Sequence, residues 1–158
     1  MKLKKLFLLR HGQYEGRGFL TVEGVETITK LSARMLDIQS FNPDETAVLC
    51  SGELRAFKTA QCLLGRLDLP TVEPIVHNAF FSNDRRCDTI EALKVLKKHI
   101  EECESLIVIT HHEMMSALPH AFCSEVLGMD TSHANGGVSY GQGYCIDCEN
   151  KTGRFIRG

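Results

Sequence analysis

The sequence lacks long apolar runs, internal repeats and low-complexity segments. No stretch approaches the roughly 20 apolar residues that a membrane-spanning helix needs. The basic residues at the start are followed by an apolar run over 6–9 only. That run is shorter than the roughly 7–15 residues of a signal-peptide core. We therefore expect a soluble, cytoplasmic protein that does not bind a membrane.

An excess of charge of either sign is also missing. The chain carries 18 Lys and Arg against 20 Asp and Glu, which gives a net charge of −2. A protein without a strong overall field has no general attraction to nucleic acid or to an anionic membrane. We therefore expect no nucleic-acid partner, although a local basic pocket needs only a few well-placed cations.

The seven cysteines are scattered and odd in number. A disulfide framework favours an even number in a short secreted chain, so we expect free thiols in a reducing compartment. Cys145 and Cys148 form a C-x-x-C motif, but the sequence has no second pair to complete a zinc site. If the motif lies on a strand, its two thiols face opposite sides of the sheet.

The chain, at 158 residues, has the length of one domain, and we expect residues 1–158 to form a single unit. Its composition, 43% hydrophobic and 24% charged, is that of an average globular protein. This composition excludes a disordered, collagen-like or coiled-coil chain. A protein of this size can bury a core without support from a metal or a disulfide.

Short apolar runs alternate with longer helical patterns along the chain. We expect strands at 6–9, 47–50 and 106–110, and weaker strands at 71–76, 143–147 and 154–156. Helical periodicity predicts a first helix after Thr21, with its apolar stripe over 25–36, and further helices at 53–67, 88–100 and 114–127. Thr21 can cap the first helix, and Gly24 is unfavourable in its first turn. The stretch 77–87 has no clear period and is interpreted as a surface loop. This order predicts a three-layer α/β/α sandwich with a mostly parallel central sheet.

Polar side chains follow the three best strands of the predicted sheet. The strands are followed by Arg10-His11-Gly12, Cys50-Ser51-Gly52 and Thr110-His111-His112. Ligands of parallel α/β sheets bind outside the carboxyl ends of the strands, so these three segments should converge. Arg55, in the first turn of the next helix, would lean back toward the same edge. Two histidines, two arginines and the amides of helix starts predict a phosphate-binding site.

One alternative is a metal site formed by His111, His112, Glu113 and His120. Neighbouring histidines at a strand end point in different directions, and this spacing matches no zinc-binding pattern. The remaining histidines that we considered, His77 and His133, fit ordinary surface positions.

Four motifs together resemble the histidine phosphatase superfamily, whose members have a phosphoglycerate-mutase-like fold. Residues 8–12 match a strand end Leu-x-Arg-His-Gly, and 20–24 match the Leu-Thr-x-x-Gly that opens the first helix. Residues 51–60 match Ser-x-x-x-Arg-Ala-x-x-Thr-Ala after the second strand, and Thr110-His111 matches the Thr-His after a later strand. The matches keep the order and spacing of the family from residue 6 to about residue 120.

This resemblance implies a role for each matched residue. His11 would be the nucleophile, which attacks phosphorus to form a phosphohistidine. Arg10, Arg55 and His111 would bind the phosphoryl oxygens and neutralise charge in the transition state, before water releases the phosphate. The resemblance implies no metal and no organic cofactor.

The sequence departs from the family pattern in the segment where many members carry an acidic general acid. That segment, 76–84, holds no glutamate. Asp84 is the nearest candidate for the acid, followed by Glu73 and Glu113. A compact chain without a clear acid resembles the SixA-type phosphohistidine phosphatases, because breaking a phosphorus–nitrogen bond depends less on an acid than breaking a phosphate ester does.

We therefore predict a metal-independent phosphatase. Its substrate would be a phosphorylated protein side chain, with phosphohistidine as the leading possibility, or a small phosphorylated metabolite. A non-catalytic phosphate-binding scaffold on the same fold and a phosphomutase are the alternatives. The sequence does not determine the oligomeric state.

Overall fold

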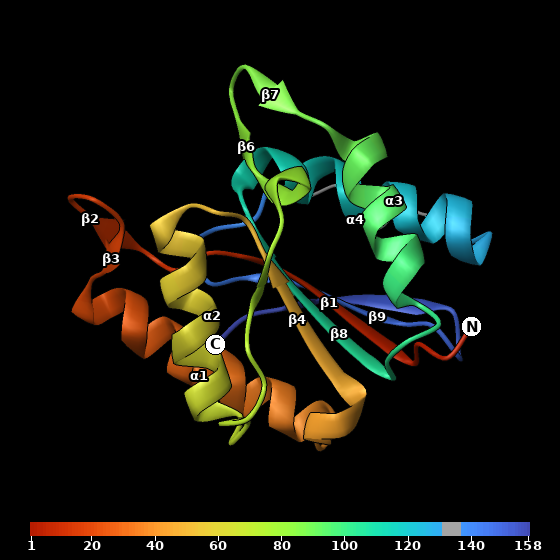
Figure 1. The fold of residues 1–158 in the computed structure, drawn as a ribbon, viewed down its shortest axis with the longest axis horizontal. Coiled ribbons are helices and arrows are strands. Elements are labelled where there is room, and N and C mark those ends of the chain that lie inside the picture. Colours follow the sequence, from red (N-terminus) through yellow and green to blue (C-terminus); the bar gives the residue numbers. More distant parts are fainter. Residues whose placement is uncertain (131–136) are drawn as a thin grey trace.

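The computed structural model describes residues 1–130 and 137–158 of the chain. In these residues the middle layer is a six-stranded sheet in the order β10-β9-β1-β8-β4-β5 (Figure 1). Its strands are β1 (Lys5–Arg10), β4 (Thr46–Cys50), β5 (Ile75–Val76), β8 (Ser105–Thr110), β9 (Gly143–Asp147) and β10 (Thr152–Ile156). The strands β1, β8, β4 and β5 are parallel, whereas β9 and β10 form an antiparallel ribbon at one edge.

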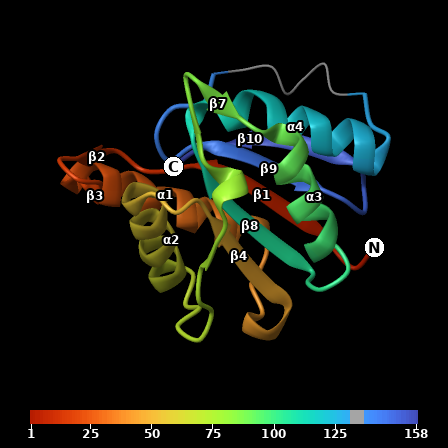
Figure 2. The same cartoon turned by 45° about the horizontal axis from the view of Figure 1, so that its top comes forward.

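Helices cover both faces of this sheet (Figure 2). The helices α1 (Val22–Ile38) and α2 (Leu54–Arg66) pack together on one face, and α3 (Thr89–His99) and α4 (His112–Leu127) pack together on the other. The predicted three-layer sandwich with a mostly parallel sheet is therefore confirmed. No helix in the described part of the chain is long and apolar enough to cross a membrane.

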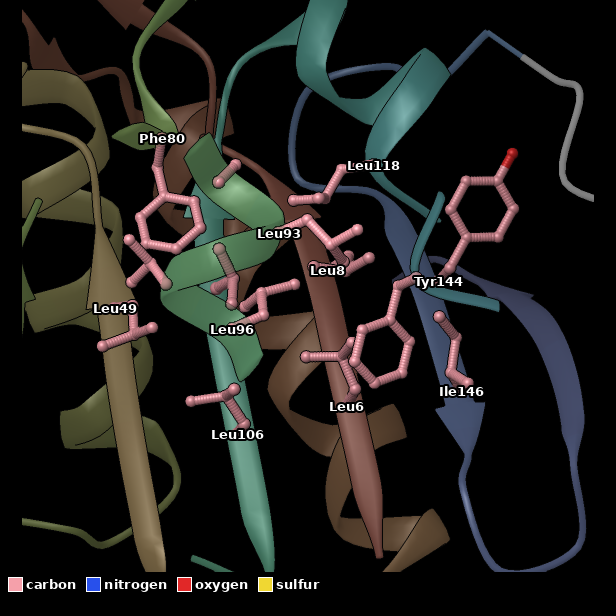
Figure 3. Close-up of a cluster of buried hydrophobic side chains, with 14 of the residues drawn as sticks. Leu6, Leu8, Leu49, Phe80, Leu93, Leu96, Leu106, Leu118, Tyr144 and Ile146 are labelled. Atoms are coloured by element: carbon pink, nitrogen blue, oxygen red, sulfur yellow. The ribbon is translucent and has the colours of Figure 1, made fainter. Parts of the chain in front are cut away.

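The central strands are apolar between their end residues because helices bury both of their faces. All six residues of β8 are buried. In β1, Leu6 and Leu8 belong to the core on the α3 and α4 side, together with Leu96 (Figure 3). The alternate residues, Phe7 and Leu9, belong to the core on the α1 and α2 side. Both faces of β1 are therefore buried, and its last residue, Arg10, lies at the end of the sheet where the parallel strands finish.

The C-x-x-C motif spans the end of β9. Cys145 packs in the core on the α1 and α2 side, and Cys148 packs in the core on the α3 and α4 side. The two thiols therefore face opposite sides of the sheet, as the strand interpretation predicts. All seven cysteines are free thiols.

The start of α1 is closely packed. The Thr21 hydroxyl accepts a hydrogen bond from the Gly24 N–H at 3.0 Å, which confirms the predicted cap. A Cβ atom on Gly24 would lie 2.2 Å from the backbone oxygen of Gln13. Glycine is therefore required here because the segment after β1 crosses directly over the first turn of the helix.

The prediction of a surface loop at 77–87 is wrong for much of that segment. It contains a short 3-10 helix, η2 (Asn78–Phe80), and a hairpin of β6 (Ser82–Asn83) and β7 (Arg86–Cys87). Phe80 is fully buried in the core, and its carbonyl accepts a hydrogen bond from the Thr110 hydroxyl. These elements are too short for their periodicity to be visible in the sequence.

A second hairpin, β2 (Tyr14–Glu15) and β3 (Phe19–Leu20), precedes α1. Figure 1 shows both hairpins beyond the end of the sheet at which β1, β4 and β8 finish. They therefore flank the edge where a ligand site was predicted.

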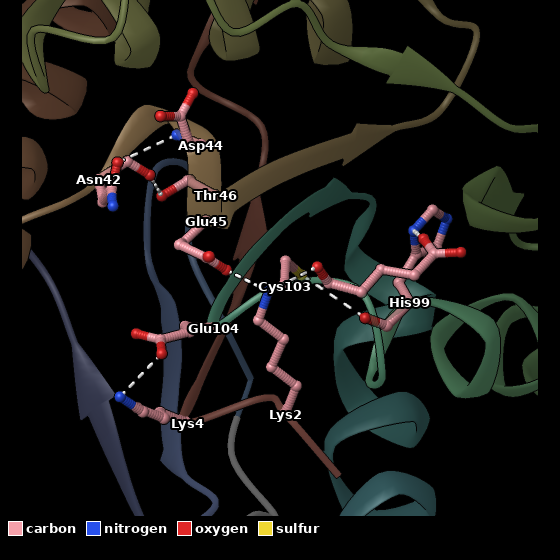
Figure 4. Close-up of polar contacts among 10 residues, drawn as sticks. Lys2, Lys4, Asn42, Asp44, Glu45, Thr46, His99, Cys103 and Glu104 are labelled. Atoms are coloured by element: carbon pink, nitrogen blue, oxygen red, sulfur yellow. Dashed lines mark hydrogen bonds and ion pairs between the residues drawn. The ribbon is translucent and has the colours of Figure 1, made fainter.

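Charged residues gather at the opposite end of the sheet, around the short 3-10 helix η1 (Pro43–Glu45) (Figure 4). Lys2 forms an ion pair with Glu45, and the Lys4 ammonium lies 2.9 Å from the Glu104 carboxylate. The Asn42 side chain accepts a hydrogen bond from the Asp44 N–H at 3.1 Å. These contacts hold the first residues of the chain in place, far from the predicted ligand edge.

Candidate active site

Adjacent strand ends bring the predicted phosphate-binding residues together. The strands β1 and β8 are hydrogen-bonded neighbours, with Arg10 level with Thr110. His11 and His111 follow these residues, and their ring centroids lie 5.1 Å apart. Arg55, at the start of α2, reaches the same point, because its Nε lies 3.3 Å from His11 Nε2. Four of the five predicted site residues are therefore neighbours.

The His11 ring is fixed by hydrogen bonds at both nitrogens. Its Nδ1–H donates to the Gly12 carbonyl at 2.9 Å, so Nε2 carries no proton and accepts from the Arg55 Nε–H. The side chain is 4% exposed. This burial, together with the charges of Arg55 and Arg10, lowers the pKa of His11 to about 4, although the bond to Gly12 opposes the shift. His11 thus presents an unprotonated Nε2 at physiological pH, whose electron pair is directed at the Arg55 guanidinium.

The backbone around His11 is held by contacts from α2 and from the loop before β9. The Gly12 N–H donates to the Thr59 hydroxyl at 2.9 Å, and that hydroxyl donates to the Arg55 carbonyl at 2.7 Å. The Gly141 N–H donates to the His11 carbonyl at 3.1 Å. Thr59, the threonine matched in the motif at 51–60, therefore connects the strand end to the helix that carries Arg55.

His111 has one hydrogen-bonded and one unpaired ring nitrogen. The Ser51 hydroxyl lies 2.6 Å from His111 Nε2 and also accepts from the Glu53 N–H at 3.4 Å. Because a hydroxyl can both donate and accept, this bond forms with either tautomer of His111: the ring proton is on Nδ1 when Ser51 donates and on Nε2 when Ser51 accepts. This Nδ1 is buried and has no partner among the described residues. Burial, and to a smaller extent His11, Arg55 and Arg10, lower the pKa of His111 to about 3.

Arg10 also has an unused donor. Its Nη1–H donates to the Val138 carbonyl at 2.9 Å, whereas its Nε is buried and has no partner in the part of the chain that the structure describes. Unpaired buried donors are rare in folded proteins, because each loses its hydrogen bonds to water. Arg10 therefore has a buried N–H that a bound anion can satisfy, and His111 has one as well in the tautomer in which Ser51 donates to Nε2.

Sequence reasoning missed two tyrosines beside His11. The ring centroids of Tyr14 and Tyr140 lie 5.3 Å and 5.5 Å from that of His11. The Arg10 guanidinium carbon lies 4.0 Å from the centroid of the Tyr140 ring, and that of Arg55 lies 4.9 Å from the centroid of the Tyr14 ring. These cation–π contacts help to hold both guanidinium groups beside His11. Tyr14 could have been noticed three residues after His11, but nothing in the sequence connects Tyr140 to the site.

The carboxylates proposed from the sequence lie in different environments. Asp84 lies between β6 and β7 and is exposed, and no hydrogen bond or ion pair in the described residues connects it to His11. Glu73 is exposed before β5. Glu113, in contrast, is half-buried in the first turn of α4, and its charge raises the pKa of His11 against the effect of burial. Of these carboxylates, Glu113 is therefore the one whose charge acts on His11, whereas Asp84 has no contact with His11 in the described residues.

The alternative metal set does not gather around one point. His112 and His120 are exposed, whereas His111 is buried against Ser51. In residues 1–130 and 137–158, no group of three or more His, Cys, Asp or Glu side chains is arranged to hold a metal ion. His133 lies outside the described residues.

Comparison with solved structures places this geometry in a known fold. A structure of the protein histidine phosphatase SixA with tungstate matches with a TM-score of 0.66 and 19% identity, over 96% of this chain and 93% of the other. The chain has the fold of the histidine phosphatase superfamily. A mycobacterial glucosyl-3-phosphoglycerate phosphatase of this fold matches with a TM-score of 0.64 and 14% identity over 96% of each chain. A protein provisionally named phosphohistidine phosphatase SixA, from Agrobacterium tumefaciens, matches with a TM-score of 0.66 and 16% identity over 92% of each chain.

No protein-family model matches the sequence, and no curated protein matches it at significant similarity. The histidine phosphatase fold predicted from the four motifs is confirmed by structure alone.

Proposed function

We propose that this chain is a phosphatase that transfers a phosphoryl group from its substrate to His11 and then to water. The observation that carries the proposal is the state of the His11 ring. Its Nδ1–H is bonded to a backbone carbonyl, so Nε2 is unprotonated, and its electron pair would become available when Arg55 turns its donors to a phosphoryl group. A neutral imidazole nitrogen held in this way is a competent nucleophile for phosphorus.

The surrounding donors fit the second requirement of phosphoryl transfer, which is the neutralisation of negative charge on the phosphoryl oxygens. Arg10 Nε and His111 Nδ1 are buried and have no partners in the described residues, and His111 Nδ1 would be a donor like Arg10 Nε with the Ser51 proton directed to His111 Nε2. An unpaired buried donor costs about 1–3 kcal/mol, so a bound phosphoryl group would relieve a cost that the free protein carries. Arg55 would add a planar fork, whose Nη1 now lies 3.3 Å from the Glu53 carboxylate.

In the first step, His11 Nε2 would form a bond to phosphorus as the bond to the leaving group breaks. A water molecule would then attack the phosphohistidine and release inorganic phosphate, which restores the neutral ring. The proposal needs no metal ion, because arginine and histidine donors would take the place of a Lewis acid.

Phosphohistidine on a protein is the substrate that we favour, and a small phosphomonoester is the second candidate. Both kinds of substrate occur among solved structures of this fold, namely the protein histidine phosphatase SixA and a glucosyl-3-phosphoglycerate phosphatase. The favoured substrate is supported by the short connections around the site, where a two-stranded hairpin is all that separates β1 from α1. A panel of phosphohistidine, phosphotyrosine and sugar phosphates would rank these substrates.

The direct test of the proposed function is His11→Ala, with the exposed His120→Ala as the matched control. We expect His11→Ala to lower kcat/KM for p-nitrophenyl phosphate by at least about 10³-fold, because removal of a nucleophile leaves only binding and electrostatic effects. The control should keep wild-type activity, and circular dichroism should show that both variants fold. Near wild-type hydrolysis by folded His11→Ala would contradict the mechanism, and an inactive wild type would favour a phosphate-binding scaffold.

A further inference from the structure

Glu113 lies in the first turn of α4, at the sheet edge that carries His11. It follows His111 by two residues. Helix side chains lean toward the helix N-terminus, and the N-terminus of α4 lies at the same sheet edge as His11. Among the charges that shift the pKa of His11, Glu113 supplies the negative one, while Arg55 and Arg10 supply the positive ones.

The Glu113 carboxyl group is oriented by a buried hydroxyl. Ser82 Oγ donates to Glu113 Oε2 at 3.1 Å and accepts from the Met114 N–H at 3.1 Å. Ser82 is 1% exposed, so this hydroxyl is fixed by the fold. No hydrogen bond or ion pair engages Glu113 Oε1 within the described ranges. Glu113 therefore has one anchored oxygen and one free oxygen.

The hairpin of β6 and β7 contains Asp84, the residue that the sequence favoured as the general acid. This is the segment in which the resemblance predicted an acid, and Asp84 lies in it, exposed between the two strands. The same hairpin contributes Ser82, the residue that holds Glu113. Ser82 of this hairpin thus positions the carboxyl group of Glu113, which belongs to α4.

We propose that Glu113 is the general acid and base of this site, an inference that rests on the proposed phosphatase function. In the first step, the His11 Nε2–phosphorus bond forms and the phosphorus–oxygen bond of an ester breaks. The electron pair goes to the leaving oxygen, which takes the proton of the Glu113 carboxyl group and departs as an alcohol.

The second step returns the proton. The Glu113 carboxylate takes a proton from water as the water oxygen bonds to phosphorus. The phosphorus–nitrogen bond breaks, and its electron pair returns to His11 Nε2. Inorganic phosphate leaves, and both side chains regain their starting states. A site with such an acid accepts esters with poor leaving groups, so its substrates extend to phosphomonoesters of ordinary alcohols.

The experiment is a leaving-group series on Glu113→Gln, which keeps an oxygen for Ser82 but removes the proton. Substituted phenyl phosphates, and one alkyl phosphate, vary the leaving group. Proton donation is typically worth about 10²–10⁴-fold. We expect Glu113→Gln to lower kcat/KM for the alkyl phosphate by that factor and for p-nitrophenyl phosphate by less than tenfold. Across the series, kcat/KM should therefore fall more steeply with leaving-group basicity in the variant than in the wild type. The matched control, Asp84→Asn, should leave the dependence unchanged.

A purely structural role for Glu113 would lower all rates by the same factor, and that result would overturn the inference. Unchanged rates in Glu113→Gln would overturn it as well, as would a steepened dependence in Asp84→Asn alone. Ser82→Ala should give an intermediate steepening, because the acid remains but loses its anchor. His11→Ala separates the two proposals, since activity in that variant contradicts the phosphatase mechanism whatever Glu113 does.

Discussion

His11 and His111 stay neutral in the folded protein at a pH at which exposed histidines become charged. Burial lowers their pKa values to about 4 and about 3, whereas a histidine in an unfolded chain titrates near 6.5. Between pH 4 and 6.5 the unfolded chain therefore binds more protons at these two positions than the folded chain does. The free energy of unfolding rises with pH in that range and falls as the solution is acidified.

We predict that this dependence weakens when either ring is replaced. Urea unfolding between pH 4.5 and 6.5, a range set by these pKa values, should show a smaller slope of stability against pH in His11→Gln than in the wild type. The double variant with His111→Asn should show a smaller slope still, because each ring accounts for nearly one proton taken up on unfolding. Equal slopes in all three proteins would mean that the rings are not buried in their neutral form.

Arg55 tests the geometry of the anion site. Its Nε–H contacts His11, its Nη1 contacts Glu53, and its guanidinium group lies against Tyr14. Lysine keeps the charge but cannot make these contacts together. We expect Arg55→Lys to lower kcat/KM by about 10²–10³-fold, the usual effect of losing one positioned donor to a transition state.

A change elsewhere on α2 supplies the control for that prediction. Arg66 is exposed at the last residue of the helix, so Arg66→Lys should leave the kinetic constants at wild-type values. Equal activity of Arg55→Lys and Arg66→Lys would show that Arg55 contributes charge alone.

At the scale of the elements, two helical glycines should respond in opposite ways to alanine. Helix propensity favours alanine over glycine by about 1 kcal/mol. Gly65 in α2 has open space where the Cβ of an alanine would lie, so Gly65→Ala should raise the free energy of unfolding by about 0.5–1 kcal/mol. In α1, a Cβ on Gly24 would meet the Gln13 backbone oxygen at 2.2 Å. Gly24→Ala should therefore destabilise the protein by more than about 1 kcal/mol. Urea unfolding measures both changes, and stabilisation by Gly24→Ala would contradict the close approach.

The long elements could be predicted from the sequence because their signals are local. The run 106–110 is β-branched and apolar, and the spacing of apolar residues marks the four helices to within a few residues. The two hairpins and η2 were missed because such short elements have no periodicity, and β5 covers only the last two residues of the weak strand predicted at 71–76. Their positions depend on distant packing, as when Phe80 enters the core and Thr110 binds its carbonyl.

At the scale of the whole molecule, the site is assembled from strand ends that the topology forces together. That rule was sufficient to predict the meeting of Arg10, His11 and His111, because parallel neighbours end at one edge. It was not sufficient for Tyr140 or Glu113, because their contributions depend on loop paths and on side-chain directions. The exposed position of Asp84 could not be predicted either, because the sequence does not show how a short hairpin is oriented.

The proposed site also predicts that activity does not depend on a metal ion. The proposed chemistry uses only nitrogen donors and a carboxyl group, so dialysis against EDTA should leave kcat and KM unchanged. The assay should compare treated enzyme before and after addition of zinc or manganese. Loss of activity that either ion restores would favour the metal site considered from the sequence, formed by His111, His112, Glu113 and His120.

The central claim, that His11 accepts the phosphoryl group, is tested most directly by trapping the intermediate. Wild-type protein would be mixed with excess p-nitrophenyl phosphate and quenched at alkaline pH within one turnover, because phosphohistidine is labile in acid. Mass spectrometry of the peptides should find one added phosphoryl group, located on His11, and none in His11→Ala. Turnover without a phosphoryl group on His11, or with the group on another residue, would contradict the account.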